Sequence, residues 1–204
     1  MPRYKLTLEY DGSEFVGWQW QANGYSVQQA LEEAVAAFCG EAVRVHGAGR
    51  TDAGVHAKAQ VCHLDLAGAP APDTLRDALN AHLRPRLVSV LTAETVNEDF
   101  DARRSATARI YRYRIVNRRA PLSLDAKRAW QISRALDAEA MARAATRMLG
   151  HHDFSSFRAS ACQAPSPVKT LDAFEVTRQS EEILLTARSE SFLHHQMRAM
   201  VGSL

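Results

Sequence analysis

The spacing of apolar residues divides the first half of the chain into short strands and two amphipathic helices. Residues 3–10 alternate between polar and apolar with a period of two, which predicts a strand. Ser26 precedes a helical apolar pattern as its N-cap, Gln29 follows at the capping-box spacing, and Gly40 ends the helix. The other elements predicted here are strands over 42–46, 59–66 and 87–96 and a helix that opens at Pro72-Asp73 and closes before Pro85.

The second half repeats this order of elements without close sequence identity to the first. Asp137 is the predicted cap of its first helix, and 151–153 is interpreted as the turn that ends this helix. The remaining predicted elements are strands over 106–116, 168–177 and 183–190 and a helix over 192–204. The order β-α-β-β-α-β is that of the ferredoxin-like unit. We therefore predict an α+β fold of two ferredoxin-like, pseudo-repeated domains, 1–100 and 101–204, joined near 97–105.

Composition is typical of a globular protein outside the membrane. Apolar residues make up 46% of the 204 residues and charged residues 24%. No apolar run is long enough to span a bilayer, and Met1–Lys5 lacks the apolar stretch of a signal peptide. The three cysteines, Cys39, Cys62 and Cys162, are widely spaced, which disfavours a disulfide framework or a zinc site. These features predict a protein of the reducing cytoplasm.

The net charge of +2 conceals an asymmetry between the halves. Residues 1–100 carry 8 Lys/Arg and 13 Asp/Glu, a balance of −5, whereas residues 101–204 carry 17 and 10, a balance of +7. Arginines interleaved with Tyr111 and Tyr113 favour contacts with phosphates and bases, although a solvated strand face is the alternative. The basic stretch contains Arg103, Arg104, Arg109, Arg112, Arg114, Arg118 and Arg119. We predict that it binds RNA, chiefly through Arg109, Arg112 and Arg114.

A glycine-punctuated loop, Gly47–Ala57, lies between two predicted strands and is the strongest candidate for chemistry. It carries Arg50 and Asp52, two residues apart. A lone carboxylate can act as a nucleophile at a sugar carbon or as a general base, and a guanidinium nearby would keep it ionised. The alternative is a tight turn with a solvated arginine and aspartate.

Two further groups of residues come from the second half. Tyr111 and Tyr113 are expected on one face of a strand, where a ring can stack on a nucleobase, although core packing is favoured for Tyr113. Arg198 is expected one helical turn after His194 and His195. Because adjacent histidines do not share a helix face, a metal site with two histidine ligands is disfavoured.

Five sequence blocks resemble the tRNA pseudouridine synthase A family, and together they cover the chain from Tyr4 to Leu204. The motif of the glycine-punctuated loop is the most specific of them. The blocks are Tyr10-Asp11-Gly12 with Phe15-Gly17-Trp18-Gln19, Gly49–Ala57, Ala106–Tyr113, His152–Arg158 and Phe192–Leu204.

The resemblance implies an enzyme that isomerises uridine to pseudouridine in the anticodon arm of tRNA, at positions 38, 39 and 40. Such enzymes break the N-glycosidic bond, turn the uracil and re-form the link through its C5 atom, without a metal or an organic cofactor. The resemblance also implies a homodimer with tRNA lying across both subunits, and a catalytic cleft between the two domains. Family chains continue beyond Leu204, so the last strand of the second ferredoxin-like domain is expected to be absent.

The resemblance also suggests roles for four residues. Asp52 corresponds to the catalytic aspartate, and Arg198 to its basic partner. Tyr111 corresponds to the tyrosine that stacks on the target base and assists proton transfer. Arg50 corresponds to the residue that replaces the flipped base in the stack. Whether the aspartate attacks the ribose C1′, attacks the uracil or removes a ribose proton stays open.

Two other classes of function remain as alternatives. A non-catalytic RNA-binding protein could use the same ferredoxin-like sheet, although the chain lacks the aromatic run of an RRM. A hydrolase with an aspartyl nucleophile would need a second acid or a metal-binding set near Asp52. The loop supplies only Arg50 and His56 beside it.

Overall fold

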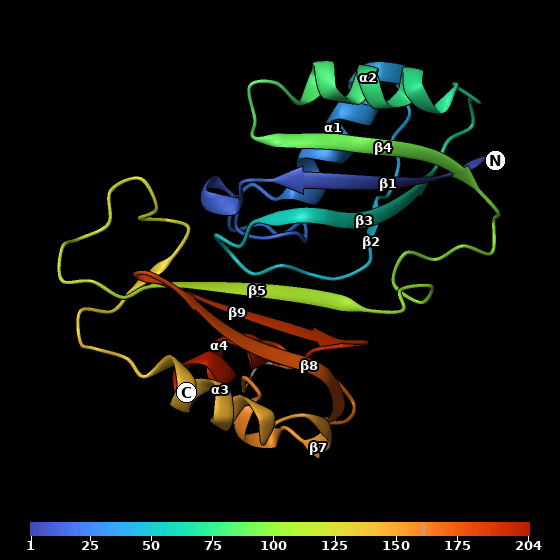
Figure 1. Cartoon of the computed structure of the whole chain (residues 1–204). Coiled ribbons are helices and arrows are strands. Elements are labelled where there is room, and N and C mark those ends of the chain that lie inside the picture. Colours follow the sequence, from blue (N-terminus) through green and yellow to red (C-terminus); the bar gives the residue numbers. More distant parts are fainter. Residues whose placement is uncertain (161) are drawn as a thin grey trace. The chain divides into compact units, whose positions relative to one another are not determined.

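The computed structural model describes residues 1–160 and 162–204, which form two compact units, Met1–Ala106 and Thr107–Leu204. Within the described residues, each unit contains one β-sheet and two α-helices (Figure 1). The prediction of a mixed α and β fold is therefore confirmed. In this part of the chain, the helices are too short or too polar to cross a membrane.

The first unit is an antiparallel sheet with the strand order β2-β3-β1-β4. Its elements are β1 (Arg3–Tyr10), the short 3₁₀ helix η1 (Gly12–Glu14), α1 (Val27–Cys39), β2 (His46–Gly47), β3 (Ala57–Asp65), α2 (Pro72–Leu83) and β4 (Val88–Val96). The predicted helix caps form at both ends of α1. The Ser26 hydroxyl accepts the Gln29 N–H at 3.1 Å, and Gly40 takes the left-handed conformation with φ +75°.

The core of the first unit follows from two periodicities. Tyr4, Leu6 and Leu8 alternate along β1 and are buried on one face of the sheet. Leu31 of α1 and Leu79 of α2 are buried in the same cluster, so the two helices cover that face (Figure 1). Each such side chain stabilises the fold by roughly 1.5–3 kcal/mol relative to leaving it exposed.

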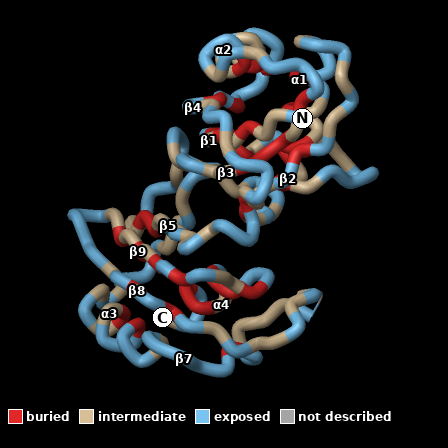
Figure 2. Tube along the Cα trace, turned by 90° about the vertical axis from the view of Figure 1, so that its right-hand side faces the viewer, coloured by how far each residue is buried: buried red, intermediate tan, exposed pale blue. Residues whose placement is uncertain are grey.

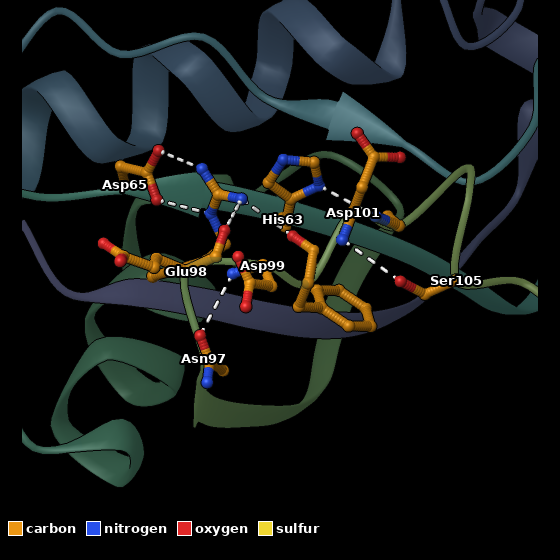
Figure 3. A network of polar contacts seen from close by, with 10 residues as sticks. His63, Asp65, Asn97, Glu98, Asp99, Asp101 and Ser105 are labelled. Atoms are coloured by element: carbon orange, nitrogen blue, oxygen red, sulfur yellow. Dashed lines mark hydrogen bonds and ion pairs between the residues drawn. The ribbon is translucent and has the colours of Figure 1, made fainter.

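A polar network attaches residues 97–105 to the strands of the first unit (Figure 3). The Arg3 guanidinium forms two 2.8 Å contacts with the Asp65 carboxylate and donates to the Phe100 carbonyl at 2.8 Å. The Nδ1 atom of buried His63 accepts the Ala102 N–H at 3.0 Å. Burial lowers the pKa of His63, which favours the neutral ring whose Nδ1 accepts this N–H.

The second unit has a sheet with the strand order β6-β5-β9-β8-β7, in which only the β5–β6 pair is parallel among the described strands. Its core gathers Ile115, Phe174, Leu185 and Met200. Figure 2 shows much of the trace of α4 as buried. The elements are β5 (Arg109–Val116), β6 (Trp130–Gln131), α3 (Ala138–Thr146), β7 (Gly150–Asp153), the 3₁₀ helix η2 (Ser155–Phe157), β8 (Val168–Gln179), β9 (Glu182–Ser189) and α4 (Gln196–Ser203).

Two local predictions for the second unit are wrong. Residues 151–153 do not end a helix but lie in β7, where His151 pairs with Thr170 of β8. The predicted helix over 192–204 begins only at Gln196, because His195 has a left-handed backbone with φ +61°. His194 therefore lies outside α4, so the predicted spacing of one helical turn between His194 and Arg198 does not hold.

The predicted strand over 42–46 is also reduced, to the two residues of β2. The backbone N–H and carbonyl of buried Val45 are hydrogen-bonded to side chains of α1 and not to a neighbouring strand. Glu32 accepts its N–H at 3.0 Å, and Gln28 donates to its carbonyl at 3.1 Å. A β-ladder cannot include backbone groups that are already paired in this way.

Candidate active-site loop

The loop Gly47–Ala57 runs from β2 into β3, as the sequence predicts, and its first residues are fixed by β3. The Ala48 N–H donates to the Val61 carbonyl at 2.8 Å. The side-chain amide of Gln60 donates to the Gly49 carbonyl at 2.7 Å. The loop is therefore bound to a strand on its entry side, which limits its conformational freedom.

The middle of the loop is held by Tyr10, the last residue of β1, and by the segment that follows this strand. The Trp18 N–H donates to the Thr51 carbonyl at 3.0 Å, and the Tyr10 and Thr51 hydroxyl oxygens are hydrogen-bonded at 2.9 Å. The Gly54 N–H donates to the Phe15 carbonyl at 3.3 Å. Thr51 directly precedes the predicted catalytic aspartate, so both its backbone and its side chain help to fix where that carboxylate begins.

Two glycines allow this segment to lie against the backbone of the loop. A Cβ atom on Gly17 would lie 2.5 Å from the Thr51 carbonyl oxygen, and a Cβ on Gly12 would lie 2.1 Å from the Val55 oxygen. Gly17 also has φ +115°, which other residues rarely adopt. Sequence reasoning missed this role. The signal available was the pair of glycines that flanks Phe15 in the N-terminal block.

Asp52 lies half-buried at the start of a tight turn in the loop. Its carbonyl accepts the Val55 N–H at 3.1 Å, and Gly54 within the turn has φ +77°. Arg50, two residues earlier, is exposed. The first unit thus places the predicted catalytic carboxylate and the predicted base-replacing arginine on one anchored loop.

Tyr111 lies on β5 in the second unit and packs against the core of that unit. It pairs with Ala187 of β9, and its ring meets the Phe192 ring edge-on with centroids 4.9 Å apart. Tyr113 also packs against this core and meets the Trp130 ring edge-on. The shared face predicted for the two tyrosines is therefore observed, with both rings partly buried.

The three arginines predicted to bind RNA have different surroundings. Arg112 is exposed on β5. The Arg109 guanidinium donates to the Glu190 carbonyl. Arg114 is half-buried and forms ion pairs with Asp125, at 3.1 Å, and with Glu182. Because two carboxylates already compensate its charge and raise its pKa, Arg114 fits a structural role better than a phosphate contact.

Arg198 is exposed on α4, whose opposite side anchors it in the second unit. Met197, Met200 and Val201 of that helix are buried among the core residues. Packing of these residues fixes where the backbone of Arg198 lies in the second unit.

Comparison with known proteins places these features in a family. A family profile described as "tRNA pseudouridine synthase" matches residues 7–103 and 144–204. The whole chain is 62% identical to a protein named tRNA pseudouridine synthase A from Paramagnetospirillum magneticum and covers 80% of it. It is 58% identical to the protein of that name from Parvibaculum lavamentivorans, of which it covers 83%. It is 60% identical to the protein of that name from Nitrobacter winogradskyi and covers 80% of it.

Proposed function

This chain belongs to the tRNA pseudouridine synthase family, and on that premise we propose that its Asp52 loop catalyses the family's reaction. The protein is an isomerase that converts uridine to pseudouridine in the anticodon stem-loop of tRNA. Positions 38, 39 and 40 are the proposed targets. The family resemblance of the five sequence blocks is thereby confirmed.

The observation that carries the catalytic assignment is the anchoring of the backbone that leads into Asp52. The residue before it is held by one backbone and one side-chain hydrogen bond, from Trp18 and Tyr10. A carboxylate fixed in this way loses little entropy on reaching the reacting atoms. In the reaction the bond between N1 and C1′ breaks and a bond between C5 and C1′ forms, while N1 gains a proton and C5 loses one. Asp52 is proposed to assist the first bond cleavage as a nucleophile or as a base.

The roles suggested for three other residues remain part of this proposal. Tyr111 contacts the target base, Arg50 occupies the space that the flipped base leaves, and Arg198 is the basic partner of the aspartate. Base chemistry requires the nucleotide to leave its stack, and an exposed arginine on the catalytic loop is suited to replace it. Arg112 is the best supported of the predicted RNA contacts, because its side chain is exposed.

Strand order supports the finer part of the fold prediction. In the first unit the order β2-β3-β1-β4 is that of a ferredoxin-like sheet. In the second unit β8, β9 and β5 lie in the order that β2, β3 and β1 have in the first. We therefore retain two ferredoxin-like pseudo-repeats as a proposal. Their boundary was predicted between domains 1–100 and 101–204, whereas the two compact units of the structure divide after Ala106. A cytoplasmic homodimer remains the proposed state of the protein.

The decisive experiment replaces Asp52 by Asn and measures two quantities on one preparation. Tritium release from tRNA labelled at uracil C5 reports isomerisation, and a gel shift reports tRNA binding. We expect binding to persist and turnover to vanish, because Asn keeps the shape but loses the charge and the nucleophilicity. Glu14→Gln, an exposed acid of the same unit, is the matched control and should keep both activities.

Other outcomes would identify the alternatives. Activity of the Asp52→Asn protein within tenfold of the wild type would remove this residue from the mechanism. Wild-type protein that binds tRNA without tritium release would be a non-catalytic RNA-binding protein. Release of free uracil would instead indicate a hydrolase.

A further inference from the structure

Trp20 is an exposed aromatic residue that the proposed mechanism does not use. Its exposed fraction is 48%, whereas that of Trp18, two residues earlier in the same loop, is 3%. Trp18 packs in the core of the first unit, where its ring lies against Gly47. The loop thus directs one indole inward and leaves the other accessible to solvent.

The loop that carries Trp20 is well ordered by hydrogen bonds. The backbone N–H of Trp20 donates to the side-chain oxygen of buried Gln28 at 2.9 Å. The Gln21 side chain donates to the Val16 carbonyl at 2.9 Å, and the Val16 N–H donates to the Tyr25 carbonyl at 3.0 Å. An aromatic side chain on such a fixed loop loses little conformational entropy when a ligand binds.

Arg44 lies in a segment that is connected to this loop through Gln28. The same Gln28 side chain that accepts from Trp20 donates to the Val45 carbonyl at 3.1 Å, so the loops of Trp20 and Arg44 are tied to one glutamine. The Arg44 side chain is 55% exposed, and its ion pair with Glu32 is long, at 3.8 Å. Such a weakly paired guanidinium can still bind a phosphate.

The loop is also tied directly to the catalytic loop. Trp18 donates its N–H to Thr51, which precedes Asp52, and it lies two residues from Trp20. Trp20 thus belongs to a segment that contacts the catalytic loop, and its exposed indole and the Arg44 guanidinium lie on the same unit as Asp52. An aromatic platform next to a cation is the arrangement by which proteins bind single-stranded RNA.

We propose that Trp20 and Arg44 form an accessory RNA contact of this enzyme. Trp20 stacks on an unpaired nucleobase of the anticodon arm, and Arg44 binds a phosphate beside that base. The inference rests on the proposed function for the identity of the RNA. It adds a contact from the first unit to those expected from the basic strand β5.

The test compares Trp20→Ala and Trp20→Phe with the wild type, using an anticodon stem-loop RNA as the probe. We expect Trp20→Ala to raise Kd and KM about tenfold with kcat nearly unchanged, because a stacked base contributes mainly to binding. Trp20→Phe should retain most of the affinity, since it keeps a ring. Leu87→Ala, which removes an exposed apolar side chain of the same unit, should change nothing.

Arg44→Gln should lower the slope of log Kd against log salt by about one, whereas Arg76→Gln should not. Arg76 is the matched control because Asp73 and Asp77 hold it at 2.8 Å. Tryptophan fluorescence provides a direct readout. The stem-loop should quench the wild type more than it quenches Trp20→Phe, and a blunt duplex of the same stem should show no such difference.

Two results would overturn the accessory contact. One is a Kd of Trp20→Ala for the stem-loop within twofold of the wild-type value. The other is fluorescence quenching by the stem-loop that is the same in Trp20→Phe as in the wild type. If Trp20→Ala had a lower urea midpoint, a normal Kd for Trp20→Phe together with its reduced quenching would still support the contact. Failure of the proposed function would appear separately, as wild-type protein that binds the stem-loop but releases no tritium.

Discussion

Replacement of Gly17 by Ala tests whether backbone packing positions the catalytic loop. The new Cβ would lie 2.5 Å from the Thr51 carbonyl oxygen, a separation that forces one of the two backbones to move. That oxygen also accepts the Trp18 N–H at 3.0 Å, so a shift weakens this hydrogen bond. The change therefore acts on the residue next to Asp52 without altering any group proposed to take part in the chemistry.

The magnitude can be worked from two contributions. Holding an alanine at φ +115° costs roughly 1–3 kcal/mol, and loss of the Trp18–Thr51 hydrogen bond costs about 0.5–1.5 kcal/mol. We expect the free energy of unfolding to fall by roughly 1.5–4.5 kcal/mol, out of the 5–15 kcal/mol typical of a domain. Gly40→Ala is the matched control, because Gly40 has φ +75° but no atom within 4 Å of the new Cβ. It should lose only about 1–2 kcal/mol.

Urea unfolding gives the stability of both variants, and tritium release from labelled tRNA gives their activity. A displacement of about 1 Å at a catalytic group can lower the rate roughly 100-fold. We therefore expect Gly17→Ala to lose activity by this order while Gly40→Ala stays near the wild type. If Gly17→Ala were as stable as Gly40→Ala and fully active, the packing of this segment would not position Asp52.

Three more predictions follow from single contacts. Because burial lowers the pKa of His63, the unfolded chain binds a proton more readily, so stability should fall as the pH drops below about 6.5. The urea midpoint should decrease between about pH 7.5 and 5 in the wild type and less in His63→Gln, and equal decreases would refute this. Tyr111→Phe keeps the ring that packs on Phe192, so tRNA binding should persist while kcat falls, and a fully active variant would leave only a packing role. Arg112→Gln should lower the salt slope of tRNA binding by about one, whereas Arg114→Gln should chiefly lower the urea midpoint, and the reverse pattern would contradict the assignment.

Features that depend only on neighbouring residues could be predicted from the order of the amino acids. The alternation along β1 predicted its buried face, and Ser26, Gly40 and Asp137 marked helix ends that the structure confirms. Each of these signals works within one strand or one helical turn, so no distant residue is needed to interpret it. The motif around Asp52 also identified the family, because the order of its residues is specific in itself.

Contacts between residues far apart in the chain became apparent only in the folded molecule. Asp125 and Glu182 compensate the charge of Arg114, although nothing within β5 indicates these partners. The side chains of Gln28 and Glu32 likewise form hydrogen bonds with the backbone of Val45, which the local pattern assigned to a strand. Hydrogen bonds and ion pairs between distant segments depend on strand register and helix packing, which the spacing of residues along one element does not contain. The loop Gly47–Ala57 could be predicted because its glycines lie close together in the sequence. Its attachment to Phe15 and Trp18 could not, because these contacts join distant segments.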